Sequence, residues 1–503
     1  MKKRFRRSLS CALAAALLVC ALSVSASAAS FADVPAGSWA AADIDRCVAL
    51  GIFQGETATT FGMGHEMTRS SFATVLCRLF GWELTAPEQA SYTDVPSTAR
   101  YYSAVETALA HGALTLQRDV FRPADPLTRE EMTVILMRAL GYETLSGLAL
   151  ELPMPFTDVT TNAGYIALAY QLGVINGTSA DTFSPAKAAT REQTAVTLMR
   201  VYDNIHRKTP GVIGVAAGEE PGDWTGYEAV AITGGRLSYG GSAQVTRPER
   251  EREKKLVKAA HAAGAKALLH VAGTTSSLQG KRLDMAAALV AAVKDGGYDG
   301  IYLNFTSLNH NMRSTLTEMV KALDGYLGDK LLYLVVEAPS WRGREYKAYD
   351  YAALSTAADR LVLRVAPYEE NLKGGFTTAP MEPLEEVYYA LNTLKDTVPG
   401  EKLCLQLTST GRLYRNTSKN GLSVTAAEVA ALQADEVHTR VYDSERYGCA
   451  YLIQKDNQNF NVVWYLDEAG AAARANLCAF FGVGEICLSD LDSVLPELRA
   501  GLQ

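Results

Sequence analysis

FADV at residues 31–34 recurs as YTDV at 92–95 and as FTDV at 156–159. After each copy come a helical pattern, a glycine and a Thr-Arg pair, and the arginines of these pairs are 60 and 62 residues apart. They are Arg69, Arg129 and Arg191. Repetition at a fixed period predicts an assembly of similar units, because each unit buries its apolar face against its neighbours.

Two helices are expected in each repeat. The first begins near an aromatic residue and ends at a glycine that suits the left-handed helix cap. These aromatic residues are Trp39, Tyr102 and Tyr165. The second helix begins at the recurring threonine, and Glu131 and Gln193, three positions further on, match the capping-box pattern, whereas Ser71 does not.

The repeated arginines are not explained by helix formation. A cation in the first turn faces the positive end of the helix dipole, which is unfavourable by roughly 0.3–1 kcal/mol. Their placement therefore indicates that each meets an anion. One interpretation is an external acidic group, since a guanidinium beside exposed helix amides is a good receptor for one. The other is an internal salt bridge to the repeated aspartate, and both stay open.

Over about residues 31–205 the pattern resembles the S-layer homology repeat. The resemblance implies an all-α bundle of three repeats with pseudo-threefold symmetry, on the surface of a Gram-positive-type bacterium. Its grooves would bind acidic, typically pyruvylated, secondary cell-wall polysaccharide. The implied groove residues are Asp33, Trp39, Gly55 and Arg69 in the first repeat, Asp94, Tyr102 and Arg129 in the second, and Asp158, Tyr165, Gly177 and Arg191 in the third.

The second repeat departs from this pattern. Leu116 stands where Gly55 and Gly177 stand in the other two. A side chain at this position would crowd the close approach of a backbone. The groove of the second repeat is therefore expected to be the weakest.

The N-terminus is typical of an exported protein. Five cations precede an apolar run from Cys11 to Val24 and the small residues Ala26–Ala28, a pattern that predicts a signal peptide over residues 1–28. The run is shorter than the about 20 residues of a membrane span, and no later apolar run of that length is present. Loss of the five cations would change the formal charge from −7 to −12, which argues against nucleic acid as a partner.

The cysteines of the mature chain give no sign of a metal site. Six remain after residue 28, without CxxC spacing or histidine clustering, and each has apolar neighbours. The pattern predicts buried thiols, no metal and no cofactor, with one disulfide as the open alternative outside the cell.

From Gly211 onward, short apolar strands alternate with helical segments, which predicts a (β/α)8 barrel of the TIM type. The predicted strands are 212–216, 229–232, 267–271, 301–305, 331–336, 361–365, 403–407 and 485–488. The chain is thus divided into the signal peptide 1–28, repeats 29–86, 87–150 and 151–206, a linker 207–211, and the barrel 212–503.

The fourth predicted strand carries the most informative motif. Strand periodicity directs Tyr302, Asn304 and Thr306 into the barrel, with Thr306 at the carboxyl end, where barrel enzymes keep their chemistry. From Asp299 onward the segment resembles the family 18 glycoside hydrolase signature Asp-Gly-x-x-x-Asp-x-Glu, especially its chitinase and spore-cortex branch. In that family the final Glu protonates the glycosidic oxygen, and the preceding Asp orients the substrate's N-acetyl group.

The departures from this signature bear on the chemistry. Asn304 replaces the Asp and Thr306 replaces the Glu. General acid–base catalysis contributes about 10²–10⁴-fold, and a threonine has no proton to give at neutral pH. The sequence therefore favours a protein held to the wall by its repeats, with a non-catalytic barrel that binds peptidoglycan, another glycan or a partner. Tyr302, Trp341 and Tyr368 are the candidate cleft residues.

An active enzyme is the alternative interpretation. It would be a glycoside hydrolase acting on wall polymers that contain N-acetylglucosamine, such as peptidoglycan or a chitin-like chain. Glu337, at the end of the fifth strand, would be its relocated acid, with Glu369 as a second carboxylate. Against this, Glu337 could cap a loop or pair with Arg342 or Arg344.

Overall fold

The computed structural model describes residues 31–116, 118–149, 152–206, 209–340, 345–365, 378, 380–416, 421–444, 447–455 and 460–502. These residues form two compact units. One takes in 31–140 and 152–203, and the other takes in 141–149 and 204–502. The predicted signal peptide, the cleft candidates Trp341 and Tyr368, and Arg342, Arg344 and Glu369 lie outside the described residues.

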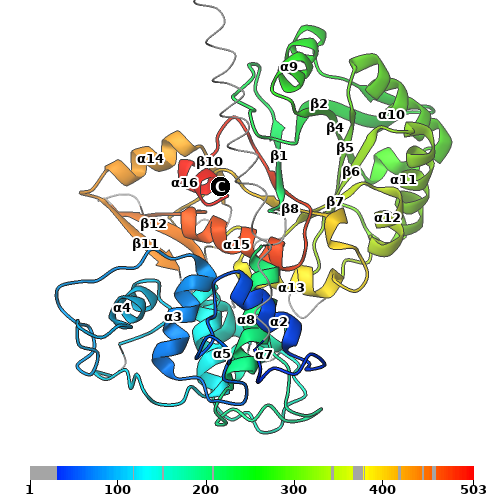
Figure 1. Ribbon diagram of the computed structural model, residues 1–503. Coiled ribbons are helices and arrows are strands. Elements are labelled where there is room, and N and C mark those ends of the chain that lie inside the picture. Colours follow the sequence, from blue (N-terminus) through cyan, green and yellow to red (C-terminus); the bar gives the residue numbers. More distant parts are fainter. Residues whose placement is uncertain are drawn as a thin grey trace, which may run out of the picture. The chain divides into compact units, whose positions relative to one another are not determined.

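Each repeat folds into two helices, as expected (Figure 1). The pairs are α2 (Ala41–Ala49) with α3 (Arg69–Phe80), α4 (Tyr102–Ala110) with α5 (Arg129–Ala139), and α7 (Ala163–Gln171) with α8 (Arg191–Ile205). The glycines after the first helices, Gly51, Gly112 and Gly173, have φ of 72°, 71° and 70°. This is the left-handed cap that the sequence predicted, which glycine adopts without steric cost.

The start of the second helix also follows the prediction. Thr128 and Glu131 form a complete capping box, and Thr190 and Gln193 exchange the same two bonds at 3.3 and 3.4 Å. Ser71 donates its amide to the Thr68 side chain at 3.3 Å, and its hydroxyl accepts the Thr68 hydroxyl at 2.8 Å. The charged Glu131 and the neutral Gln193 therefore cap their helices in the same way.

The three repeats close into a ring through short backbone pairings. Isolated β-bridges join Thr68 to Pro126, Thr128 to Ala188 and Thr190 to Glu66, so each repeat pairs with the next and the third pairs with the first. The arginine amides donate to carbonyls of the following repeat at 2.9–3.1 Å. An all-α bundle is therefore not confirmed, and the helix amides expected to be exposed are already occupied.

All eight predicted barrel strands are present and run parallel. They are β1 (Gly211–Ala216), β2 (Ala229–Tyr239), β4 (Lys266–Thr274), β5 (Gly300–Thr306), β6 (Leu331–Glu337), β7 (Arg360–Arg364), β8 (Leu403–Leu407) and β14 (Glu485–Leu488). Strand β1 pairs with both β2 and β14, which closes the barrel. A short strand, β3 (Ala243–Thr246), extends β2 as an antiparallel edge.

Helices follow the strands and lie outside the strand ring, as Figure 1 shows for α9 to α12. They are α9 (Arg250–Ala262), α10 (Arg282–Gly296), α11 (Arg313–Leu327), α12 (Tyr351–Ala357), α13 (Leu384–Leu394) and α15 (Glu468–Phe480), with the short α6 (Glu143–Leu148) and α16 (Pro496–Ala500) in the same unit. The described part of this unit also has 3₁₀ turns at Thr275–Gln279, His310–Met312 and Gly400–Lys402. In the described part of the chain, no helix has the length and apolar character that a membrane crossing requires.

The barrel interior is filled by side chains from alternate strand positions. Its buried cluster includes Ile213, Leu268, Tyr302, Tyr333, Val362, Cys404 and Cys487. This confirms the predicted inward direction of Tyr302 and the packed interior typical of such barrels. The six cysteines of the repeats and barrel are free and buried, and burial raises the pKa of Cys77 to about 11.

A second sheet is inserted between β8 and β14, which the sequence analysis did not predict. It is antiparallel, in the order β10-β9-β13-β12-β11. Its elements are β9 (Gly411–Arg415), β10 (Leu422–Val424), β11 (Thr439–Ser444), β12 (Cys449–Lys455), β13 (Phe460–Tyr465) and helix α14 (Ala426–Ala434).

Candidate functional site

The repeated arginines reach from one repeat into the next. Each Nε donates to a phenylalanine carbonyl of the following repeat, at 2.7 Å from Arg69, 2.9 Å from Arg129 and 2.8 Å from Arg191. Each guanidinium also lies over the ring of that phenylalanine, 4.6–4.9 Å from its centroid. The acceptors are Phe121, Phe183 and Phe61. The grooves thus lie between repeats, whereas the sequence analysis assigned one groove to each repeat.

The repeated aspartates hold the loops that carry these phenylalanines. Asp33 accepts the amides of residues 61–63 at 2.7–2.9 Å. Asp94 and Asp158 each accept two amides at the matching places. Burial opposes ionisation of Asp33, but the amide bonds outweigh it and lower its pKa, and the Phe183 amide foremost lowers the pKa of Asp158. Among the described residues, none of the three aspartates pairs with a repeated arginine, so the internal salt bridge is not formed.

The loop glycines serve the loops themselves. A Cβ on Gly55 would lie 2.5 Å from the Thr57 carbonyl and 2.6 Å from the Phe31 ring, and one on Gly177 would meet equivalent atoms. Their small size is therefore needed for loop closure. Leu116, which replaces them in the second repeat, is 57% exposed.

The remaining repeat contributes to each groove a residue near the start of its first helix. Trp39, 64% exposed, lines the Arg129 groove, Tyr101 lines the Arg191 groove, and Asn162 lines the Arg69 groove. Each groove is thus built from all three repeats.

Tyr102 and Tyr165 were the other two aromatic residues predicted to line the grooves, and the prediction for Tyr102 is wrong. Tyr102 is 3% exposed and its hydroxyl donates to the Pro87 carbonyl, so it lies in the core and its neighbour Tyr101 faces the groove. Tyr165 lies under the Arg138 guanidinium, 5.6 Å from carbon to centroid.

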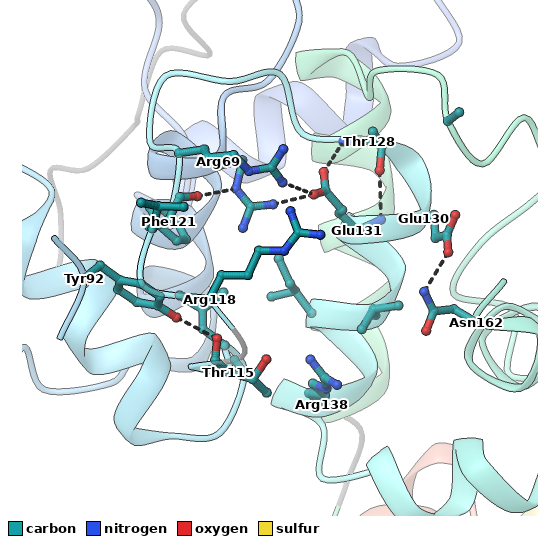
Figure 2. A pocket seen from close by; sticks show the side chains of 17 residues that line it. Arg69, Tyr92, Thr115, Arg118, Phe121, Thr128, Glu130, Glu131, Arg138 and Asn162 are labelled. Atoms are coloured by element: carbon teal, nitrogen blue, oxygen red, sulfur yellow. Dashed lines mark hydrogen bonds and ion pairs between the residues drawn. The ribbon is translucent and has the colours of Figure 1, made fainter. Parts of the chain in front are cut away.

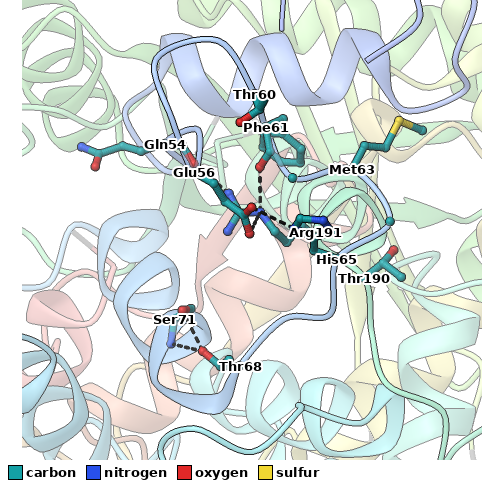
Figure 3. A network of polar contacts seen from close by, with 12 residues as sticks. Gln54, Glu56, Thr60, Phe61, Met63, His65, Thr68, Ser71, Thr190 and Arg191 are labelled. Carbon is teal, nitrogen blue, oxygen red and sulfur yellow. Dashed lines mark hydrogen bonds and ion pairs between the residues drawn. The ribbon is translucent and has the colours of Figure 1, made fainter. Parts of the chain in front are cut away.

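The three grooves differ in how their central arginine is neutralised. Arg69 forms an ion pair with Glu131 at 2.7 Å, in a groove that Arg118 also lines (Figure 2). Arg191 donates to the Gln54 and Phe61 carbonyls and lies 3.7 Å from Glu56 (Figure 3).

In the described part of the chain, Arg129 has no ion pair. It donates to the carbonyls of Phe183 and Asn176. Lys187 and Arg200 line the same groove, together with Trp39 and Gly177. Among the described residues, this is therefore the groove whose central arginine has no ion pair with a carboxylate. Burial lowers the pKa of Arg129, as it does for the two equivalent arginines.

The degenerate signature residues occupy the two ends of barrel strand β5. Asp299, just before the strand, accepts the Ala267 amide at 2.9 Å and lies 2.8 Å from His261, so it fastens a loop at the amino end. Asn304 and the exposed Thr306 lie at the carboxyl end. Tyr302 is 1% exposed, with its hydroxyl 3.6 Å from the Cys487 sulfur. Its burial in the core contradicts its selection as a cleft residue.

An arginine joins the carboxyl ends of three strands at the barrel mouth. Arg364 donates from Nη1 to Asn304 Oδ1 and from Nε to Glu337 Oε1, both at 3.1 Å. The Asn304 amide nitrogen lies 3.4 Å from His270 Nε2, and burial lowers the pKa of His270 to about 4, so this ring is neutral at neutral pH. Burial opposes the charge of Arg364, but the bond to Glu337 outweighs it and raises the pKa of Arg364. Sequence reasoning missed Arg364, although it ends a predicted strand.

Family models match both units. The S-layer homology domain model matches residues 30–73, 91–133 and 155–195, and the model of glycosyl hydrolases family 18 matches 232–479. The chain carries three S-layer homology domains and a family 18 glycosyl hydrolase domain. The three arginine-lined grooves belong to the former, and the Arg364 mouth belongs to the latter.

Curated relatives match part of the chain. An exoglucanase XynX of Acetivibrio thermocellus is 32% identical over 167 residues, 31% of this chain and 15% of the relative. A surface-layer 125 kDa protein of Lysinibacillus sphaericus is 27% identical over 209 residues, 40% of this chain and 17% of the relative. The chain thus spans less than a fifth of the length of either. The S-layer homology domains and these surface proteins identify a secreted protein associated with the cell wall or S-layer.

The family 18 domain has the fold of solved chitinases. A class V chitinase of Pseudomonas fluorescens Pf-5 superposes with a TM-score of 0.50 at 18% identity, over 58% of this chain and 100% of the other. At this identity the likeness shows the fold alone. The mouth residues described above, and not the fold, bear on whether the domain is catalytic.

Proposed function

We propose that the S-layer homology domains hold the protein to the wall by binding acidic groups, such as pyruvate ketals, of the secondary cell-wall polysaccharide. The observation that carries this proposal is the Arg129 groove. Arg129 lies over an aromatic ring with no carboxylate partner in the described residues, beside Lys187 and Arg200. Exposed Trp39 adds a flat apolar face for a sugar ring. A planar guanidinium in such a setting favours a carboxylate ligand.

The test is co-sedimentation of the full chain with purified cell-wall sacculi, before and after mild acid removes the pyruvate ketals. Binding that falls at least tenfold after ketal removal is expected. Arg46→Gln serves as the control variant, because Arg46 pairs with Asp203 on an exposed surface outside the grooves. Equal binding to both preparations would contradict the proposal.

We further propose that the family 18 domain binds wall glycan without hydrolysing it. Asn304 and Thr306 replace the second Asp and the Glu of the signature, and Glu337 is engaged by Arg364. A carboxylate in an ion pair accepts hydrogen bonds and has no proton to give to a leaving oxygen. The mouth keeps polar groups that suit sugar hydroxyls, namely the exposed Thr306 and the 28% exposed side chain of Glu337.

Binding by this domain is tested by calorimetry of the full chain with chitohexaose. Saturable binding is expected, and it should weaken in Thr306→Trp, which fills the mouth, while wall attachment through the grooves is unchanged. Absence of binding to chitohexaose and to peptidoglycan fragments alike would contradict a glycan-binding role.

The alternative function is a glycoside hydrolase that uses Glu337 as its acid. The observation in its favour is the position of Glu337 at the carboxyl end of β6, next to Asn304 in the same network. For catalysis, the ion pair with Arg364 would have to open when substrate binds. Hydrolysis that depends on Glu337 is the outcome that distinguishes this alternative.

A further inference from the structure

One position in the second helix of each repeat differs among the three copies. It is the third helical residue, Ser71, Glu131 or Gln193. Glu131 Oε2 accepts the Thr128 amide at 3.0 Å, and Gln193 Oε1 accepts the Thr190 amide at 3.3 Å. A neutral side chain thus caps the helix as a charged one does, so capping does not require the charge of Glu131.

The same position faces the arginine of the preceding repeat. Glu131 Oε1 accepts hydrogen bonds from Arg69 at 2.7 Å and from Arg122 at 3.0 Å (Figure 2). Gln193 lines the groove of Arg129, and Ser71 lines the groove of Arg191. Equivalent places in the three grooves are therefore occupied by a carboxylate, an amide and a hydroxyl.

We propose that Glu131 competes with the acidic ligand for Arg69, so that the third residue of each second helix sets the affinity of the preceding repeat's groove. The inference rests on the proposed function of the grooves. A ligand carboxylate entering the Arg69 groove has to displace or share a charge-assisted hydrogen bond and to approach a like charge. The side chains of Arg69 and Glu131 are only 13% and 29% exposed, so solvent screens this competition weakly.

Two other residues of the Arg69 groove, Asn162 and Arg118, bear on its affinity. The start of the first helix of repeat three contributes Asn162 to the lining of this groove, whereas the start of the first helix of repeat one contributes the exposed Trp39 to the Arg129 groove. Arg118 still lines the groove, which retains attraction for an anion. We therefore expect the Arg69 groove to bind the acidic ligand weakly, and to bind it more tightly when the charge of Glu131 is removed.

Glu131→Gln is a well-matched test, because it converts the residue to the one that repeat three uses. The probe is a methyl glycoside carrying a pyruvate ketal, titrated calorimetrically into the full chain. Loss of the competing carboxylate is expected to strengthen binding in the Arg69 groove about tenfold, which corresponds to one charge-assisted hydrogen bond. Glu83→Gln is the control, because it removes an exposed charge of the same unit at a residue that does not line any of the three grooves. Equal melting temperatures would show that both variants fold.

The reciprocal substitution, Gln193→Glu, places a carboxylate beside Arg129. It is expected to weaken binding there about tenfold. The ligand-induced change in tryptophan fluorescence that is lost in Trp39→Phe reports on that groove. If the unsubstituted chain binds the glycoside and neither substitution changes its affinity, this inference is wrong and the proposed function is unaffected. Absence of binding by the unsubstituted chain would overturn both.

Discussion

The Arg129 groove and the barrel mouth each place an arginine at the end of a secondary-structure element, but with different partners. Arg129 is bonded to backbone carbonyls and lies beside further cations, with no carboxylate partner among the described residues. Arg364 is bonded to Glu337 and Asn304. The first arginine keeps its charge for a ligand, whereas the second is neutralised internally. Both arginines are at least partly buried, so the presence or absence of a neighbouring carboxylate decides which of them can bind an acidic ligand.

Substitution of the two arginines should give the largest contrast. Arg129→Gln removes charge-assisted bonds to an acidic ligand and is expected to weaken binding of the pyruvylated glycoside about 10–100-fold at that groove. Arg364→Gln is expected to change it less than twofold. The change in tryptophan fluorescence that is lost in Trp39→Phe measures the first effect, and calorimetry measures both. Equal losses of glycoside affinity in the two variants would contradict the proposed difference between the groove and the barrel mouth.

The barrel ion pair is expected to contribute to stability. Glu337→Ala leaves the Arg364 charge, 30% exposed, without its carboxylate, and should lower the free energy of unfolding by about 1–2 kcal/mol. Glu318→Ala is the control, because its pair with Arg282 is more than half exposed and is worth at most about 0.5 kcal/mol. Urea denaturation measures both. A Glu337→Ala variant as stable as the control would show that the pair is not formed in solution.

Salt should separate the two regions further. Raising NaCl from about 0.05 to about 0.5 M screens an approaching ligand charge, so binding of the pyruvylated glycoside is expected to weaken several-fold. Binding of the uncharged chitohexaose to the barrel should change little. A strong salt dependence of chitohexaose binding, measured by the same calorimetry, would contradict this contrast.

Lowering the pH should change the stability of the two units in opposite directions, and this is the smallest of the expected effects. Asp33 and Asp158 have lowered pKa values, so their contribution to stability is complete above about 3.9, the unfolded value, and is lost as pH falls through the folded one. Burial foremost raises the pKa values of Glu382 and Glu485, so their contribution is present below about 4.3 and is lost as pH rises through the folded value.

Scanning calorimetry across this pH range measures the difference. The S-layer homology unit should lose stability first on acidification, and Asp33→Asn should flatten that loss. The barrel unit should keep its stability to lower pH. Parallel losses in both units would show that other groups dominate the acid response.

Much of this architecture could be predicted from local patterns. The eight barrel strands followed from alternating apolar runs, and the helix ends followed from Gly51 and its two equivalents. The inward direction of Asn304 and Tyr302 followed from strand periodicity, which fixes the face of a side chain before its partners are known.

The contacts that decide function were less predictable. Glu337 and Arg364 are 27 residues apart, and nothing in a local pattern pairs them. Tyr101 and Tyr102 are adjacent, so a one-residue uncertainty in a helix start decides which of them faces the groove. Strand β11 is exposed at most positions, so it lacks the alternation that marks a strand.

The central claim, that the repeats receive acids while the barrel mouth has lost its acid chemistry, is tested most directly by one assay. The purified full chain is incubated with isolated peptidoglycan and chitooligosaccharides, and bound protein and released reducing ends are followed in the same samples. We predict binding without release, in the unsubstituted chain and in Thr306→Ala and Glu337→Ala alike. Release that survives Thr306→Ala and is abolished by Glu337→Ala would contradict the account and establish Glu337 as a relocated catalytic acid.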